Sequence, residues 1–346
     1  MTAPGRARAW LAELHPASFG VVMATGIVSI ACQLHGFVSL AIGLLGINIV
    51  LYAALWALTA ARLAWHRDRV VADLWHHGRA VGFFTTVAAT CVLGSQTLLI
   101  IGAWQAASAL WVAGIALWGV VTYTVFTVLT VKAEKPSLAE GINGGWLLAV
   151  VAGQSVCVLG AQLAEGFGIY ASHVLFFCLV MWLGAGMLYI WIISLIFYRY
   201  TFFVISPSDL APPYWINMGA VAISTLGGAT LAASAPHAAL LNELLPFVKG
   251  LTLFYWATAT WWIPMLLTLG VWRHIYRRFP IQYDPLYWGG VFPLGMYAVC
   301  TFRLAAVMDA PFLLIVARTF LFASLAAWSL TMVGLVRHLA RLARGV

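Results

Sequence analysis

The chain has 346 residues, of which 63% are hydrophobic and only 8% are charged. Soluble domains carry about 25% charged residues, so this composition excludes a water-soluble enzyme, a disordered chain and a small disulfide-stabilised domain. The mean hydropathy of +0.96 indicates a polytopic membrane protein. The net charge of +8 has to be placed along the chain before it is interpreted, because membrane proteins keep Lys and Arg in their cytoplasmic loops.

Apolar segments of spanning length follow one another from the N-terminus to the C-terminus. A membrane span needs about 20 largely apolar residues, so we expect one transmembrane domain over residues 1–346, with an all-α integral membrane fold of ten transmembrane helices. The expected spans are 17–35, 38–61, 80–101, 106–131, 144–163, 168–197, 214–235, 244–271, 286–307 and 311–336.

The loops between these segments alternate in charge. The loops near His35, Ala103, Glu165, Glu243 and Asp309 are short and hold almost no Lys or Arg. The other loops and the two termini hold 15 of the 18 basic residues: Arg6, Arg8, Arg62, Arg67, Arg69, Arg79, Lys132, Lys135, Arg199, Arg273, Arg277, Arg278, Arg337, Arg341 and Arg344. The positive-inside rule places this basic set in the cytoplasm. We therefore expect a multi-pass protein of the plasma (inner) membrane with both termini cytoplasmic, which agrees with an even number of spans.

The odd-numbered segments begin near residues 17, 80, 144, 214 and 286, at intervals of 63, 64, 70 and 72 residues. Each unit is a helical hairpin with a short outer turn, and a nearly fixed period indicates a repeat architecture. Odd segments are rich in Gly, Ser and Thr, whereas even segments are rich in Trp. Small residues permit close helix packing. Two arrangements fit: an inner ring of five odd helices sheathed by even helices that face lipid, or a compact bundle without a pore.

A path through an inner ring would be lined by hydroxyl, amide and glycine groups. The odd segments contain no Asp or Glu in their cores, which argues against a cation channel or a proton pump. Hydroxyl and amide donors replace part of the hydration shell of an anion. The alternative for each such residue is a hydrogen bond between helices. The candidate pore-lining residues are Thr25, Gly26, Thr85, Thr86, Gln154, Ser155, Ser224 and Thr225.

Three basic residues lie on the expected outer side, namely Lys249, Arg303 and Arg318. A charge at the bilayer centre costs about 2.5–3.5 kcal/mol or more, so these side chains reach the interface, pair, or face water. In one interpretation they make the outer mouth positive and attract anions. In the other they are ion pairs or interface anchors, with Lys249 beside Glu243 and Arg303 beside Asp309.

Pro293 follows Phe292 inside the ninth segment. A proline there removes one backbone hydrogen bond and kinks the helix. The kink would direct the Phe292 ring into a central lumen if a lumen exists. The alternative is a packed Phe beside an ordinary proline kink.

No metal or cofactor site is predicted. The five Cys residues lie in apolar stretches and form no C-x-x-C pair, and the His residues between Arg62 and Arg79 are irregularly spaced. This basic loop and the tail from Arg337 to Arg344 are expected to contact anionic lipids.

Three stretches carry a family resemblance. They are His15-Pro16-Ala17-Ser18-Phe19 followed by Met23-Ala24-Thr25-Gly26-Ile27-Val28-Ser29, then Phe83-Phe84-Thr85-Thr86-Val87, and Val291-Phe292-Pro293-Leu294. Together they resemble the tellurite-resistance/C4-dicarboxylate transporter family. This family is also called TehA-like, and it includes the slow anion channel of plant guard cells. The resemblance covers essentially the whole chain.

The resemblance implies five hairpins with quasi-fivefold symmetry, a central pore lined by the odd helices, and frequent assembly as a homotrimer. It also implies a gating Phe on the ninth span, which matches Phe292. The third and fifth segments depart from the pattern because they have no mid-span proline, so bends there would rest on Gly94, Gly153 or local breaks.

The leading functional hypothesis is an anion channel or uniporter with a Phe-gated pore. Its candidate substrates are C4-dicarboxylates such as malate, sulfite, chloride, nitrate and tellurite. Proton-coupled export of sulfite or a dicarboxylate is the alternative, with His35, His173 and His237 as titratable groups near the outer side. A membrane redox enzyme is disfavoured, because it would need paired His residues or clustered carboxylates at membrane depth. The expected partners are small anions, lipids and further copies of the chain; no enzymatic activity and no nucleic acid are expected.

Overall fold

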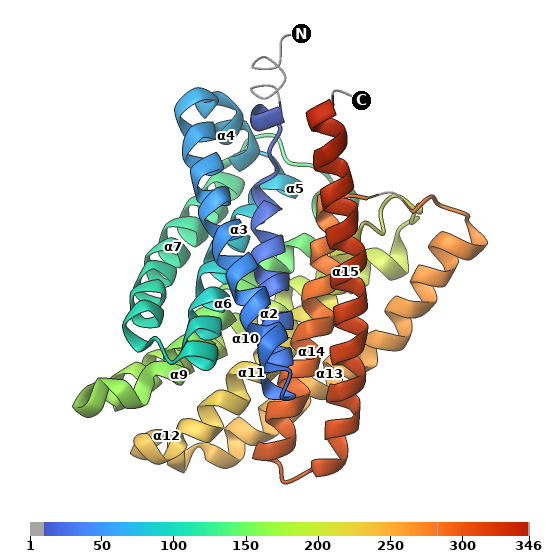
Figure 1. Cartoon of the computed structure of the whole chain (residues 1–346). Helices are drawn as coiled ribbons and strands as arrows, with labels where there is room; N and C mark the ends of the chain where they lie inside the picture. The colour runs from blue at the N-terminus through green and yellow to red at the C-terminus, as the bar shows by residue number, and fades with distance from the viewer. Residues whose placement is uncertain (1–9, 282, 345–346) are drawn as a thin grey trace.

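The computed structural model describes residues 10–281 and 283–344, which form helices and turns and contain no strand. Arg6 and Arg8 lie outside the described residues. Ten long helices in these ranges form the body of the molecule (Figure 1): α2 (Gly20–Leu34), α3 (Val38–Trp65), α6 (Phe84–Ile101), α7 (Trp104–Val131), α9 (Leu148–Leu163), α10 (Ala171–Phe202), α11 (Ile216–Ser234), α13 (Leu245–Val271), α14 (Trp288–Val307) and α15 (Leu314–Arg344).

Short helices connect the long ones. Tight 3₁₀ turns lead directly into α2, α6, α9, α11 and α14, and these turns are η1 (Pro16–Phe19), η2 (Val81–Phe83), η3 (Gly144–Leu147), η5 (Pro212–Trp215) and η8 (Pro285–Tyr287). The other connections include α4 (Arg67–Leu74), α5 (His77–Ala80), α8 (Leu138–Gly141), η4 (Ala164–Tyr170), η6 (Ala235–His237), α12 (Ala239–Glu243), the π-helical turn η7 (Trp272–Tyr276) and η9 (Pro311–Leu313).

Eight helical segments of the described chain are long and apolar enough to cross a membrane, judged by length and composition. Two features separate this number from the ten expected spans. The segment Gly144–Phe202 counts once, although it contains both α9 and α10 joined through η4, where Gly168 has φ 55°. The helix α13 is less apolar because it carries Lys249, Pro264 and several Thr and Trp residues. The chain is thus a helical, multi-pass membrane protein.

Two sets of helices differ in burial. Between 67% and 89% of residues are buried along the apolar stretches of α2, α6, α11 and α14, against 17–28% along α3, α7 and α15. The buried set, with α9, makes a closed circuit of contacts in the order α2, α6, α9, α11, α14 and back to α2. Each of its members also packs against the long helix that follows it in the chain. We call α2, α6, α9, α11 and α14 the inner helices. We call the long helices that follow them, α3, α7, α10, α13 and α15, the outer helices.

Aromatic side chains of the outer helices bond to the inner helix of the next hairpin. The same arrangement occurs at each step around the circuit, and the last outer helix returns to the first inner one. The hydrogen-bonded pairs, with the residue of the outer helix first, are Tyr52 and Thr90 (2.9 Å), Trp111 and Val156 O (3.0 Å), Trp182 and Ser224 O (2.7 Å), Trp256 and Thr301 (2.9 Å), and Trp328 and Thr25 (2.9 Å). These four indoles therefore point inward, although tryptophan-rich helices were expected to face lipid.

Glycines permit the close approach of the inner helices. A Cβ on Gly219 of α11 would lie 2.7 Å from Cγ of Pro293 in α14, and a Cβ on Gly295 would lie 2.9 Å from the side chain of Ile27. Near the N-terminal turns, a Cβ on Gly144 would clash with the carbonyl oxygen of Pro213. The small residues of the odd segments thus serve helix packing as well as any lumen.

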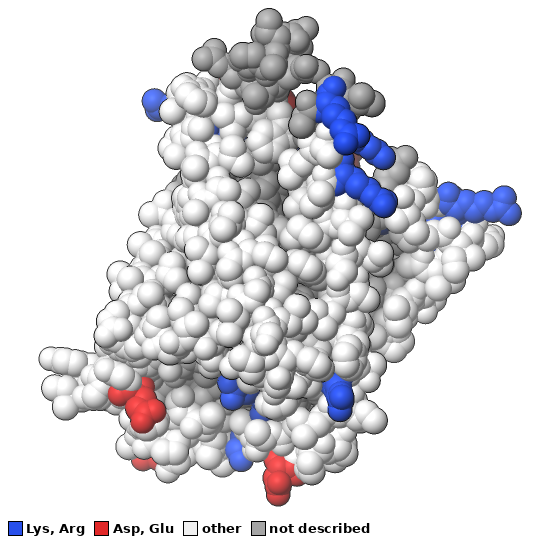
Figure 2. Space-filling view, viewed as in Figure 1, with Lys and Arg blue, Asp and Glu red and all other residues white. Residues whose placement is uncertain are grey.

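Charged side chains gather at two ends of the molecule. The face in Figure 2 has Lys and Arg at one end, Asp, Glu and a few basic residues at the other, and an uncharged belt between them. The first described helical turn and the end of α15 lie at the same end (Figure 1). This distribution suits a chain whose middle section is surrounded by hydrocarbon.

Candidate functional site: two cavities among the inner helices

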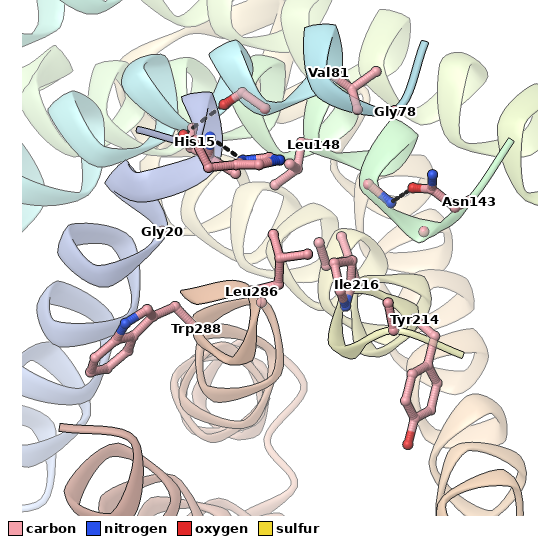
Figure 3. A pocket seen from close by; sticks show the side chains of 18 of the residues that line it. His15, Gly20, Gly78, Val81, Asn143, Leu148, Tyr214, Ile216, Leu286 and Trp288 are labelled. Atoms are coloured by element: carbon pink, nitrogen blue, oxygen red, sulfur yellow. Dashed lines mark hydrogen bonds between the residues drawn. The ribbon is translucent and has the colours of Figure 1, made fainter. Parts of the chain in front are cut away.

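A cavity of about 260 Å³ lies where the N-terminal turns of all five inner helices meet. We call it the large cavity. Its wall includes His15, Ala17, Thr85, Asn143, Gly144, Leu148, Arg199, Asp209, Tyr214, Ile216, Leu286, Trp288 and Phe292. The side chains of His15, Leu148, Ile216 and Leu286 point into it, whereas the rings of Tyr214 and Trp288 turn away from its centre (Figure 3).

Four of the turns that surround the large cavity are capped in the same way. A side-chain acceptor at one residue receives the backbone N–H two residues later. The pairs are His15 Nδ1 with Ala17 (3.0 Å), His76 Nδ1 with Gly78 (3.2 Å), Asn143 Oδ1 with Gly145 (2.8 Å) and Asp284 Oδ1 with Leu286 (2.7 Å). Helix N-termini carry partial positive charge. Five of them converge here, so the cavity is suited to negative solutes.

His15 supplies a neutral donor to the large cavity. Burial, followed by the positive charge of Arg79, lowers the pKa of His15 from 6.5 to about 4. Nδ1 accepts the N–H of Ala17, so the proton of the neutral ring is on Nε2. The imidazole projects into the cavity (Figure 3). At neutral pH it therefore presents an N–H group and no charge.

A buried ion-pair network supports the wall next to His15. Asp73 is 6% exposed and pairs with both Arg62 and Arg79. Arg62 also donates to the carbonyl oxygen of Ala12 at 3.0 Å. The network thus ties α3, α4 and the segment before η1 together. Removal of one member of a buried pair costs about 3–5 kcal/mol, so this network holds the cavity wall in place.

A second cavity of about 20 Å³ lies further along the same five helices. We call it the small cavity. A volume of about 10–15 Å³ is needed for one water molecule, so the small cavity suits one water-sized occupant. Its wall is Ile27, Ile30, Cys91, Val92, Ser95, Leu99, Ser155, Val158, Gln162, Ile223, Leu226, Met296, Val299 and Arg303.

One face of α14 runs past both cavities. Phe292 lines the large cavity, and Met296, Val299 and Arg303 line the small one. Intervals of three or four residues place these side chains on one side of a helix. Phe292 is 2% exposed. Phe292 therefore borders the large cavity one helical turn before Met296, the first residue of α14 that lines the small one.

The expected lining residues divide into two groups. Thr85 lines the large cavity, and Ser155 lines the small one. Thr25 and Ser224 accept the indole bonds of Trp328 and Trp182, the first through its hydroxyl and the second through its carbonyl oxygen. The Thr25 side chain therefore faces α15, and the Ser224 hydroxyl donates to the carbonyl oxygen of Ala220 in its own helix.

The other four expected lining residues, and Pro293, line neither cavity. Gln154 donates to Trp182 O at 3.1 Å, and Gly26 faces Val92 and Asn48. The Thr86 and Thr225 hydroxyls donate to carbonyl oxygens of their own helices, those of Phe83 and Val221. Pro293 packs against Gly219.

The three outer basic residues also differ. Arg303 lines the small cavity. Lys249 and Arg318 lie on α13 and α15; Lys249 is partly buried, Arg318 is exposed, and neither lines a cavity. No ion pair joins Lys249 to Glu243 or Arg303 to Asp309 in the described residues.

Several wall residues were not predicted from the sequence to line a pore. They include His15, Arg199 and Met296. A signal for Met296 exists, because it lies one turn beyond Phe292 on the same face. His15 and Arg199 stand at helix ends, where hydropathy carries no information on which side chains meet.

Inner helices that enclose a polar and an apolar cavity, within a molecule that has an uncharged belt between two charged ends, are typical of a membrane transport protein. Comparison with known proteins agrees. The family profile described as voltage-dependent anion channel (SLAC1) matches residues 13–336, and the chain belongs to this family of anion channels and transporters. The family is of the transporter and channel type and is not enzymatic.

Three relatives illustrate its range. An uncharacterized membrane protein of Mycobacterium tuberculosis (strain ATCC 25618 / H37Rv) is 37% identical over 155 residues, which are 44% of this chain and 77% of that protein. An uncharacterized transporter of Methanocaldococcus jannaschii is 23% identical over 82% of this chain and 81% of its own length. A sulfite efflux pump of Arthroderma benhamiae is 23% identical over 88% of this chain and 85% of its own length.

Proposed function

We propose that the chain is a channel or uniporter that carries small anions through a pore along the axis of the inner helices, with Phe292 as its gate. The observation that carries the proposal is that the same five helices enclose both cavities, and that Phe292 lines the large cavity one helical turn before Met296, which lines the small one. A hydrophobic constriction closes a pore by excluding water. Rotation of one Phe ring would then connect the two cavities.

The proposal includes ten spans and quasi-fivefold symmetry. The circuit of contacts among α2, α6, α9, α11 and α14, and the outer helix packed beside each, support five hairpins around one axis. The basic end of the molecule is then cytoplasmic by the positive-inside rule, together with both termini. On this view the large cavity opens toward the cytoplasm of a cell bounded by the plasma membrane. Assembly as a homotrimer is part of the proposal, with lipids around the outer helices.

The proposed substrates are small anions, and the electrostatics of both ends support this charge. Five helix N-termini face the large cavity, and Arg303 lines the small one. The carboxylates that line the large cavity, Glu140 and Asp209, lie on the segments that precede α9 and α11. Sulfite is a candidate because relatives are named sulfite efflux pumps. Malate and other C4-dicarboxylates, chloride, nitrate and tellurite follow from the family resemblance.

Purified protein in liposomes tests the proposal. Anion-dependent currents across a panel of sulfite, malate, nitrate and chloride salts are expected, with a reversal potential that follows the anion gradient. Liposomes without protein are the control. The absence of anion-dependent current from correctly folded protein would contradict the proposal.

A second candidate is proton-coupled export of sulfite or a dicarboxylate; the name of the fungal relatives, sulfite efflux pump, supports the export of sulfite. The same recording separates the two. At a fixed gradient of the conducted ionic species, a pH gradient leaves the reversal potential of a channel or uniporter unchanged, whereas it shifts that of a proton-coupled transporter.

A further inference from the structure

Arg199 is a buried cation at the wall of the large cavity. It lies in the last turn of α10, it is 7% exposed, and it lines the cavity. Its Nε atom is buried and has no hydrogen-bond partner among the described residues. The closest carboxylate oxygen is Oδ1 of Asp209, 3.5 Å from Nη2. A buried charge without close partners is costly, so an added acceptor would stabilise this guanidinium.

Arg62, at the same end of the molecule, is a buried arginine whose guanidinium has close hydrogen-bond acceptors. It is 4% exposed, its Nη2 donates to Asp73 Oδ2 at 2.8 Å, and Nε and Nη2 both donate to Ala12 O. The two arginines are similarly buried, yet only Arg62 has close acceptors. Arg62 does not line the cavity and Arg199 does, so of these two arginines only Arg199 combines a guanidinium without close acceptors with a place at the cavity wall.

Asp209 is held away from Arg199 by its own loop. Its Oδ2 accepts from the backbone N–H and the hydroxyl of Ser206, both at 2.8 Å. Partial burial raises the pKa of Asp209. The hydrogen bonds from Ser206 and the charge of Arg199 lower this pKa by a larger amount, so it lies below its ordinary value. Asp209 is therefore a fixed negative charge at neutral pH. It compensates Arg199 over a distance and leaves the guanidinium donors open.

We propose that Arg199 binds a small carboxylate-type oxyanion in the large cavity, and that Asp209 competes with this anion for the guanidinium. This inference rests on the proposed function, since it names the class of anion at the cytoplasmic opening. A planar guanidinium donates two parallel N–H bonds to two oxygens of one anion, which a spherical halide does not match. The competing carboxylate keeps binding weak, and weak binding allows an anion to leave again during conduction.

Direct binding tests the inference without transport. The full-length protein in detergent is titrated with sodium acetate or sodium chloride at matched ionic strength, and the melting temperature is followed. Ligand that binds only the folded state raises the melting temperature in proportion to its saturation. Acetate is expected to stabilise the protein at lower concentration than chloride. Equal effects of the two anions would overturn the assignment to an oxyanion.

Two substitutions act in opposite directions if Asp209 is a competitor. Arg199→Gln should raise the half-saturating acetate concentration at least about tenfold, because charge-assisted hydrogen bonds are lost. Asp209→Asn should lower it about threefold, because the competing charge is gone. A purely structural ion pair predicts that both variants melt earlier and that neither changes the response to acetate. That result would overturn the proposal.

Two further variants complete the test. Arg199→Lys keeps the charge without the planar fork, so it should bind anions but lose the preference for acetate over chloride. Arg69→Gln removes a basic residue whose side chain is 57% exposed, and it should leave the acetate response unchanged. A loss in Arg69→Gln as large as in Arg199→Gln would refute a specific site. Acetate binding in protein that carries no anion current would contradict the proposed function and still support this site.

Discussion

The two cavities are enclosed by the same five helices, yet they differ in size and chemistry. The large cavity, of about 260 Å³, is surrounded by helix N-termini, His15, Asn143 and Arg199. The small cavity, of about 20 Å³, is lined mainly by Ile, Val and Leu, with Arg303 as its charged residue. The difference arises because the inner helices begin with capped 3₁₀ turns at one end and pack as regular helices beyond Phe292. In the proposed function, the first end collects anions and the middle restricts their passage.

The largest expected effect comes from Phe292→Ala, which should join the two cavities if Phe292 is the gate, as proposed. Anion current per folded protein should rise about tenfold or more, since a barrier lowered by about 1.4 kcal/mol already gives that factor. Currents in liposomes or oocytes, normalised to surface expression, provide the measurement. Phe84→Ala is the matched control, because Phe84 is also buried on an inner helix but packs against Phe126 and lines neither cavity. An unchanged or smaller current in Phe292→Ala would reject the gate.

The packing behind the gate gives the next effect. In Gly219→Ala the new methyl group meets Pro293 directly behind Phe292, at 2.7 Å from Cγ. Overpacking of this kind costs about 1–3 kcal/mol, so the melting temperature in detergent should fall by several degrees. Gly43→Ala is the control, because a Cβ on Gly43 of α3 meets nothing within 4 Å. If both variants melt at the same temperature, the contact between α11 and α14 is not tight.

The charge at the small cavity predicts a moderate effect. Arg303→Gln should reduce anion current about threefold at low salt, because the local positive potential that concentrates anions is weakened. The reduction should shrink at high salt as the charge is screened. Lys249→Gln and Arg318→Gln should change the current less, since neither residue lines a cavity. A stronger effect of either variant than of Arg303→Gln would place the anion path elsewhere.

The smallest effect concerns the pH response of the large cavity. The pKa of His15 is lowered from 6.5 to about 4 in the folded protein, so folding favours the neutral ring. The stability that depends on this ring is fully present above pH 6.5 and is lost as the pH falls from 6.5 toward 4. The groups that act on it are Arg79, Asp73, Asp284 and Arg62.

His15→Asn isolates this contribution, because an Asn side chain can still accept the N–H of Ala17. The wild-type melting temperature should fall more steeply than that of the variant between pH 6.5 and 4. Parallel curves would mean that folding does not lower the pKa of His15.

Hydropathy alone located the long helices well. Each of the ten apolar segments drawn from the sequence overlaps one of the long helices of the structure, although α3, α7, α10 and α15 extend beyond the expected bounds. The contrast between small-residue and aromatic segments also indicated which helices are buried. These properties are local, because each depends on the composition of about 20 consecutive residues.

Which face of each inner helix turns toward the axis was decided only by the tertiary structure. Thr25 and Thr85 are chemically alike, but Trp328 engages the first and the large cavity meets the second. Inner helices are apolar around their whole circumference, so they lack the periodic contrast that reveals a face in sequence. The same holds for Arg199 and Asp209: their separation in space, and the loop bond from Ser206 that maintains it, depend on how α10 and α11 are joined. Composition determined that the chain enters a membrane as helices; long-range packing decided which few polar groups meet at its centre.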